Sequence, residues 1–266
     1  ESKMASEVKT NKVSPSTGVT VTLGDASDVF QLPASAEIDI ASGATLDVNG
    51  TIDVTGATTT GFPSSGLNRQ VVYTASTSAG GYSPEADVTK LIVIVQGGGG
   101  GGNRHDSSNA YMHGGAGGGY VMGFISPVTS SETMTVTVGS AGAGAATDNA
   151  GGGSGTVSSF ASVTGTSFTT LSGGGGTGGG TVSNVSPAGG TATGGDLRVV
   201  GGTTVAWQGD TGPGSGGSLL GNSGAANNSA NTTYPNGTGY GAGGAWGYQN
   251  SAGDGSAGVV IIQEYK

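Results

Sequence analysis

Six consecutive glycines, Gly97–Gly102, follow directly on the apolar stretch Leu91–Val95, and further glycine runs recur to the end of the chain. Of the 58 glycines in this 266-residue chain, only nine precede residue 91. Ordering a glycine costs roughly 0.5–1 kcal/mol more than ordering an alanine, so the glycine-rich part requires on the order of 25–50 kcal/mol of compensation. That exceeds the net stability of a typical domain, about 5–15 kcal/mol. The region is therefore either disordered or a fold in which only glycine fits.

Short β-branched runs between the glycine tracts favour the ordered alternative, because disordered chains lack such apolar clusters. They are typical of buried strands, and they lie at Leu91–Val95, Tyr120–Ile125, Met134–Val138 and Val259–Ile262. Period-two patterning predicts strands at 71–73, 133–138, 156–160, 167–171, 197–200 and 259–265. No stretch shows helical periodicity over more than a turn or two. The fold class predicted is all-β.

The glycine tracts themselves have two physical fates. They can remain flexible linkers, or they can form extended left-handed helices of the polyproline II type, with three residues per turn and no internal hydrogen bonds. Several such polyglycine helices packed side by side can hydrogen-bond to one another, and an inward Cβ would push them apart. Linkers do not return to strands such as Val259–Ile262. We therefore predict a β-framed bundle of polyglycine II helices over residues 67–266.

Residues 1–66 have a different sequence pattern from the rest of the chain. Three apolar–Asp–apolar units, Ile38–Ile40, Leu46–Val48 and Ile52–Val54, are separated by glycine-containing turns. Each unit is a three-residue strand, too short to be stable alone. We predict an N-terminal attachment stem of intertwined chains, most simply three, joined through a linker at 57–67. An ordinary β-meander is the alternative.

Composition excludes several function classes. The net charge is −9 and the eight basic residues are scattered, which argues against binding to nucleic acid or an anionic membrane. Cysteine is absent, so disulfides, thiolate metal sites and a cysteine nucleophile are impossible. His105, Asp106 and His113 are too irregularly spaced to predict a metal site. With no positioned carboxylate pair or Ser-His-Asp grouping, we expect no cofactor, no metal and no enzymatic activity.

The order of strands and glycine tracts resembles the glycine-rich domain at the tips of bacteriophage tail fibres, and is similar in style to the polyglycine-helix adhesins that cap long tail fibres. The resemblance spans about residues 67–266. It is carried by Val71–Ala75, Leu91–Val95, Gly97–Gly102, Gly114–Tyr120, Thr135–Gly139, Gly151–Gly155, Gly173–Gly176 and Gly253–Ile262. It implies a receptor-binding tip whose loops between glycine helices contact the bacterial surface.

The non-glycine inserts are the candidate binding segments, because the glycine scaffold needs no side chains there. Aromatic faces beside amide and carboxylate groups suit sugar rings or protein surfaces. The alternative for the tryptophans is that they cover the glycine layers as part of the core. The candidate receptor-binding residues are Arg104, His105, Asp106, Tyr111, His113, Trp207, Tyr234, Tyr240, Trp246, Tyr248 and Gln249.

These observations predict a non-enzymatic tail-fibre or tail-tip adhesin of the virion, acting outside the cell. We expect a homotrimer that attaches to other tail or baseplate proteins through its N-terminus and binds a bacterial surface glycan or an outer-membrane protein. Two alternatives belong to other classes. One is a structural subunit of an extracellular or virion filament, and the other is an ice-binding protein with a flat face of glycine helices.

Overall fold

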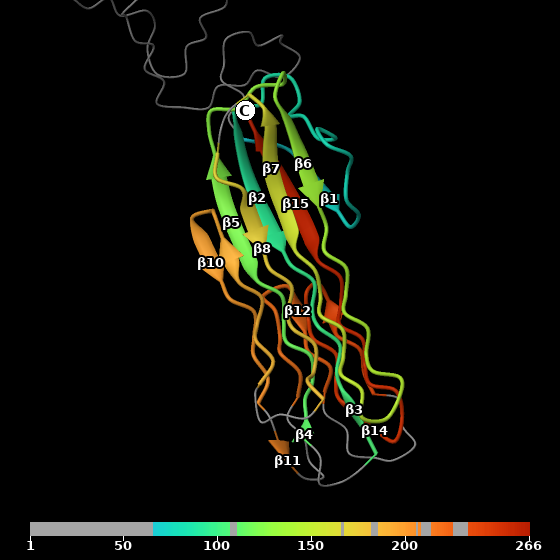
Figure 1. The fold of residues 1–266 in the computed structure, drawn as a ribbon. Coiled ribbons are helices and arrows are strands. Elements are labelled where there is room, and N and C mark those ends of the chain that lie inside the picture. Colours follow the sequence, from blue (N-terminus) through green and yellow to red (C-terminus); the bar gives the residue numbers. More distant parts are fainter. Residues whose placement is uncertain are drawn as a thin grey trace, which may run out of the picture. The chain divides into compact units, whose positions relative to one another are not determined.

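The computed structural model describes residues 66–106, 111–165, 168–181, 186–205, 214–225 and 234–266, and the backbone of 207–208. The predicted stem, apart from Gly66, lies outside these residues. Two β-sheets occupy one end of the described unit and a bundle of extended glycine segments forms the other (Figure 1). The described residues form no helix, and therefore none that could cross a membrane. The all-β prediction is confirmed.

The larger sheet is antiparallel throughout and has the strand order β1–β15–β2–β5–β10. Its strands are β1 (Leu67–Tyr73), β15 (Val259–Tyr265), β2 (Lys90–Gln96), β5 (Tyr120–Ile125) and β10 (Leu197–Val199). The last strand of the chain thus lies between the first two, which ties the beginning of the described unit to its end.

The smaller sheet has four antiparallel strands in the order β6–β7–β8–β9. These are β6 (Thr133–Thr137), β7 (Ser158–Thr164), β8 (Leu171–Gly173) and β9 (Ala192–Thr193). Three two-stranded ladders lie along the bundle, made of β3 (Arg104–His105), β4 (Tyr111–Met112), β11 (Trp207–Gln208), β12 (Gly221–Asn222), β13 (Thr238–Gly239) and β14 (Gly247–Tyr248).

The hydrophobic core lies between the two sheets. Alternate residues of β2, Leu91, Val93 and Val95, point into it and are fully buried. They pack in one cluster with Met134 and Phe160 of the smaller sheet. The sequence predicted a buried strand at Leu91–Val95, and in the structure its burial alternates, with Ile92 and Ile94 only partly buried.

One predicted strand is wrong. The segment 167–171 was expected to be a strand, but 168–170 is not one and β8 begins at Leu171. The pairing partner explains the shift, because Ser158–Phe160 of β7 face Leu171–Gly173. The last residue of β8 is Gly173. A side chain does not fit there, because a Cβ on Gly173 would lie only 2.5 Å from the Gly119 carbonyl oxygen.

Gly97–Gly102 continues β2 into the bundle and forms its axis. Its amides donate in rotation to three neighbouring segments at 2.9–3.0 Å. Gly97 and Gly100 donate to the segment 116–119, Gly98 and Gly101 to 153–156, and Gly99 and Gly102 to 253–256. A partner that recurs every third residue is the signature of a helix with three residues per turn.

The carbonyl groups of this axial segment accept from three further segments. Gly142 and Ala145 donate to Gly99 and Gly102, Gly176 and Gly179 donate to Gly98 and Gly101, and Gly244 donates to Gly100. The axial helix is therefore surrounded by six neighbours, three that accept from it and three that donate to it. All six amides and the carbonyls of Gly98–Gly102 are satisfied by backbone groups, and the Gly97 carbonyl accepts from the Gln96 side chain at 3.4 Å, which meets the requirement for buried polar groups.

Close packing explains why this run contains only glycine. A Cβ placed on any residue of Gly97–Gly102 would lie 2.0–2.2 Å from a carbonyl oxygen of a neighbouring segment. The segment 114–119 is surrounded in the same way: its amides donate to 244, 177, 202, 241 and 174. The predicted packed lattice is thus present. It admits the methyl group of Ala116, which is fully buried, and it requires glycine at those positions where a Cβ would overlap a neighbouring carbonyl oxygen.

A buried charge lies at the sheet end. Glu264 of β15 is fully buried and accepts hydrogen bonds from Arg69 at 2.5 Å and from the Tyr82 hydroxyl at 2.9 Å. Arg69 also pairs with Glu85 at 2.7 Å. Burial and the hydrogen bond to Glu264 raise the pKa of Tyr82. This cluster fastens β1, the entry strand, to β15.

Candidate functional site

The inserts between glycine segments meet at the end of the bundle that lies away from the sheets (Figure 1). Two short ladders join inserts that are far apart in sequence. Gly247 and Tyr248 pair in parallel with Arg104 and His105, and Trp207 pairs with Met112. The first predicted insert and the two tryptophan-bearing inserts therefore form one cluster, which we call the tip.

Asn103 ends the axial glycine helix. It is fully buried, and its side-chain amide donates to the carbonyls of Tyr111 at 2.9 Å and Gly180 at 2.8 Å. Its side-chain carbonyl accepts the His113 amide at 2.9 Å. The side chain thus replaces the lattice partners that the backbone loses where the glycine run stops.

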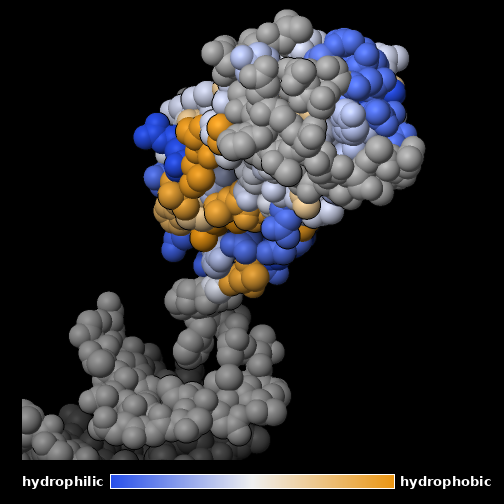
Figure 2. Space-filling model, turned by 90° about the horizontal axis from the view of Figure 1, so that it is seen from below, coloured by the Kyte–Doolittle hydropathy of each residue, from blue (hydrophilic) through white to orange (hydrophobic). Residues whose placement is uncertain are grey.

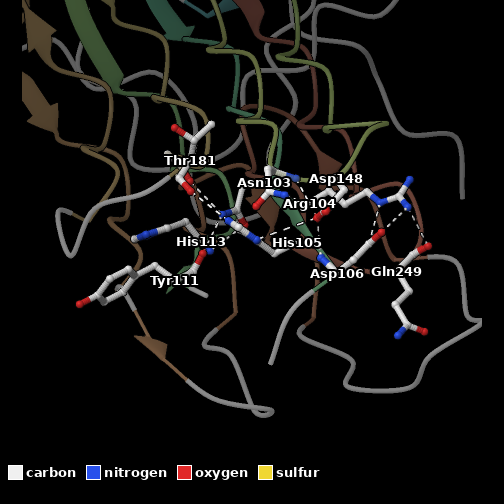
Figure 3. A network of polar contacts seen from close by, with 11 residues as sticks. Asn103, Arg104, His105, Asp106, Tyr111, His113, Asp148, Thr181 and Gln249 are labelled. Carbon is white, nitrogen blue, oxygen red and sulfur yellow. Dashed lines mark hydrogen bonds and ion pairs between the residues drawn. The ribbon is translucent and has the colours of Figure 1, made fainter. Parts of the chain in front are cut away.

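Arg104 holds three inserts together at the tip (Figure 3). Its guanidinium donates to both carboxylate oxygens of Asp106, at 3.2 and 3.3 Å, and to the carbonyls of Ala146 at 2.5 Å and Gln249 at 3.0 Å. The planar guanidinium suits such a multidentate arrangement, which a lysine could not reproduce. Asp106 is exposed and Arg104 is partly buried, so the ion pair lies at the surface of the tip.

His105 lies beneath this surface and is only 6% exposed. Its Nε2 lies 3.0 Å from the Thr181 carbonyl oxygen, and its Nδ1 is 4.0 Å from a carboxylate oxygen of Asp148 without a hydrogen bond. The same Asp148 oxygen accepts the Asp106 amide at 2.7 Å (Figure 3). The histidine therefore packs between the inserts and does not point outward.

Two tip residues adopt left-handed backbone conformations: Asn149 has φ 58° and Gln249 has φ 61°. Asparagine tolerates this region well, whereas glutamine does so less readily. The Gln249 side chain is exposed, while its carbonyl is held by Arg104. Strain of this kind persists only where surrounding contacts fix the backbone, and it is concentrated at functional sites.

The aromatic residues divide into buried and surface groups. Trp246 is fully buried and Tyr234 is 1% exposed, with ring centroids 5.7 Å apart. Burial raises the pKa of Tyr234, whose hydroxyl donates to the Tyr248 carbonyl at 2.8 Å. Tyr111 is partly exposed and stacks on the buried His113, with centroids 6.4 Å apart.

The structure therefore sorts the predicted binding residues. Four of them are buried: Trp246, Tyr234, His113 and His105. For Trp246, the alternative prediction that a tryptophan covers the glycine layers as part of the core agrees with this burial. The rings of these four residues cannot meet a partner while the tip keeps this packing. The predicted residues that reach the tip surface are Arg104, Asp106, Tyr111, Tyr248 and Gln249. Only the strand position of Trp207 is described.

Tyr240 lies elsewhere. Its amide donates to the Leu220 carbonyl at 3.0 Å. The next residue, Gly241, faces Gln96 and Gly97, where the larger sheet passes into the bundle. Tyr240 is therefore separated from the tip by the length of the axial glycine run, and we exclude it from the site.

Asp148 and Thr181 were missed by the sequence reasoning. Both belong to non-glycine breaks in glycine tracts, at 146–150 and from 181 onward. That signal is the same one that identified the other inserts. Among the described residues, no three His, Asp or Glu side chains lie close enough together to hold a metal ion.

The two sheets, the glycine lattice and the insert cluster define a glycine-rich β-protein in which a rigid backbone scaffold carries loops at one end. The model of the glycine-rich domain family matches residues 74–265, and the chain belongs to that family. The match begins in the turn after β1 and runs to the end of β15. No curated protein is similar enough to count as a match.

Proposed function

We propose that the chain is a non-enzymatic bacteriophage tail-fibre or tail-tip adhesin that binds a bacterial surface receptor through the tip. The observation that carries the proposal is that the entry of the chain and the inserts lie at opposite ends of the described unit. Leu67 of β1 pairs with Tyr265 near the C-terminus, at the sheet end, whereas the inserts gather at the opposite end (Figure 1). A protein that is attached at its N-terminus would thus present its inserts outward. The resemblance to phage tip domains supports this assignment.

The scaffold suits a binding role physically. Loops held on a rigid lattice lose little entropy on binding, which favours affinity. Several copies on one virion would convert weak contacts into strong attachment. We propose a homotrimer joined to other tail or baseplate proteins through residues 1–66, located in the virion and acting outside the cell.

The tip surface favours short-range recognition. A carboxylate, a guanidinium, a side-chain amide and two partly exposed tyrosines lie within one cluster, supplied by Asp106, Arg104, Gln249, Tyr111 and Tyr248. Such a set combines apolar contact with hydrogen bonds in both directions, which suits a surface glycan or an outer-membrane protein. The net charge of −9 disfavours nucleic acid as a partner.

A cell-binding assay tests the proposal. Fluorescently labelled full-length protein is added to a panel of bacterial strains, and the bound fraction is compared with that of the Tyr111→Ser/Gln249→Gly variant. Both positions are at the surface, and glycine suits the left-handed backbone at 249. Val163→Ser, an exposed change on the smaller sheet, is the matched control. We expect binding to some strains, a loss of at least about tenfold in affinity for the tip variant, and no change for the control.

Two results would count against the proposal. Absence of binding to every strain contradicts the adhesin function, and equal binding by the tip variant and the control contradicts the assignment of the tip. The structural-subunit alternative remains a second candidate because the described residues leave an apolar face of the larger sheet uncovered. Electron microscopy of the purified protein separates the two candidates: a structural subunit would form polymers, and an adhesin would form discrete particles.

A further inference from the structure

The outer face of the larger sheet is apolar as well as the inner one. An antiparallel sheet with one face in the core normally presents polar residues on the other face. Here the outward positions of β2 include Ile92 and Ile94, and those of β5 include Met122 and Phe124. The smaller sheet covers only the inner face, so this surface has no partner among the described residues.

Strand register aligns these side chains in a row across all five strands. Val72 faces Ile261, Ile261 faces Ile94, Ile94 faces Met122, and Met122 faces Leu197. The next outward positions add Ile92 and Phe124. We call these seven residues the outer apolar face. Figure 2 shows hydrophobic residues gathered on one side of the described part of the chain.

Several of these side chains are strongly exposed: Phe124 is 57%, Val72 47% and Leu197 44% accessible. The other four are partly exposed. Seven neighbours of this kind form one contiguous apolar patch, and the largest such patch on a protein, typically roughly 300–600 Å², often has a function.

We propose that the outer apolar face is a self-association surface, on which the same face of another copy of this chain packs around a symmetry axis. Sheet-on-sheet packing through apolar faces is a standard way to bury such a surface. In the proposed homotrimer the three outer apolar faces would surround the threefold axis, so each face would contact only the same face of the other copies. The seven residues include no charged group, so the apolar face itself brings no like charges together when two copies meet.

The surroundings of the face fit a homo-oligomer. Its neighbours Gln70 and Gln263 hydrogen-bond to each other at 2.9 Å, and together with the exposed Lys90 of β2 they supply a polar rim. An apolar centre with a polar rim is the usual anatomy of such interfaces, and homodimer interfaces are the more apolar ones. The patch would form the centre of an interface of about 800 Å² per partner.

The path of the chain points to a second copy as the occupant. Residues 1–65 lead directly into β1, the strand that contributes Val72. This assignment of the occupant rests on the homotrimer proposed above: copies held together through their N-terminal parts would have a high effective concentration of the outer apolar face. The inference concerns assembly at the sheet end and does not depend on what the tip binds. Failure of the cell-binding assay would therefore leave it intact.

The absence of cysteine permits a direct test in the full-length protein. Phe124→Cys places one thiol on the face, and Val163→Cys places one on the smaller sheet at a matched exposure of 50%. We expect a bulky maleimide to label the first variant about tenfold more slowly, because labelling requires the interface to open. Equal rates would overturn the proposal.

A second measurement identifies what covers the face. Ile94→Cys on the central strand should form disulfide-linked dimers under mild oxidation, well above the yield of Val163→Cys. Protection at position 124 without dimers at position 94 would mean that something other than a second copy lies there, and would also overturn the proposal. Circular dichroism melting confirms that each variant is folded, and Met122→Cys replaces Ile94→Cys if that variant is not.

Discussion

The packing of the axial glycine helix makes Gly100→Ala the sharpest test of the fold. The new methyl group would lie 2.2 Å from the Thr177 carbonyl oxygen and 2.5 Å from its carbon. Non-bonded heavy atoms are most stable at roughly 3.5–4.0 Å, so the neighbouring segment must move by about 1 Å or more. That movement disturbs the bonds of Gly100 to Ala116 and Gly244 and the Ala116–Thr177 bond, all at 2.9 Å.

The magnitude follows from these contacts. Two or three weakened hydrogen bonds contribute about 0.5–1.5 kcal/mol each, and overpacking adds about 1–3 kcal/mol. Alanine also lowers the conformational entropy of the unfolded chain, which offsets about 0.4–1 kcal/mol of this destabilisation. We therefore expect the free energy of unfolding to fall by about 1–7 kcal/mol, and each kcal/mol lowers the melting temperature by about 2–4 °C in a unit of this size.

Gly217→Ala is the matched control. Gly217 lies in the same bundle, has no positive φ, and its added Cβ would meet nothing closer than 3.8 Å. This variant should be as stable as the wild type or up to about 1 kcal/mol more stable. Urea unfolding followed by circular dichroism compares the three proteins. If Gly100→Ala were no less stable than Gly217→Ala, the close-packed lattice would be refuted.

Three further predictions concern the polar clusters. Arg69→Ala leaves Glu264 buried without its cation and should lower the free energy of unfolding by roughly 2–3 kcal/mol. Arg69→Lys keeps a positive charge and should lower it less. Equal decreases for the two variants in denaturant titrations would contradict the ion-pair argument. The raised pKa of Tyr82 means that its contribution is full below about pH 10 and is lost as pH rises above that value. Melting temperature should therefore fall at alkaline pH, and less steeply in Tyr82→Phe; parallel curves would argue against this. Arg104→Lys should hardly change the melting temperature but should speed amide exchange in 146–150 and 247–249, and unchanged exchange would show that the guanidinium does not hold the inserts.

The existence of the lattice could be predicted from the sequence. Which glycine segments hydrogen-bond to each other could not. Glycine content and the strands that return after each tract already favoured packed glycine helices over a linker. The neighbours of Gly97–Gly102 lie as far away as 253–256. Lattice contacts join backbone amides and carbonyls, which are the same at every residue. Hence no side-chain pattern specifies which tract lies beside which.

The candidate site was predictable in part for a related reason. The inserts could be recognised as breaks in the glycine tracts, and the structure brings those at 103–106, 111–113, 146–150 and 246–250 together. Burial could not be predicted, since an aromatic ring suits both a glycine layer and a receptor surface. Trp246 and Tyr234 pack inside, whereas Tyr111, with the same composition around it, reaches the surface.

The division between lattice and inserts has a consequence for how such a protein can vary. Lattice bonds require glycine at surrounded positions such as Gly100, and a methyl group there displaces a neighbouring backbone. The inserts depend on a few anchoring side chains, of which Asn103 and Arg104 make most of the bonds to backbone carbonyls. Exposed residues between these anchors, such as Asp106 and Gln249, contribute little to the lattice. The specificity of the proposed receptor binding would therefore change through exposed tip residues while the scaffold and its stability remain the same.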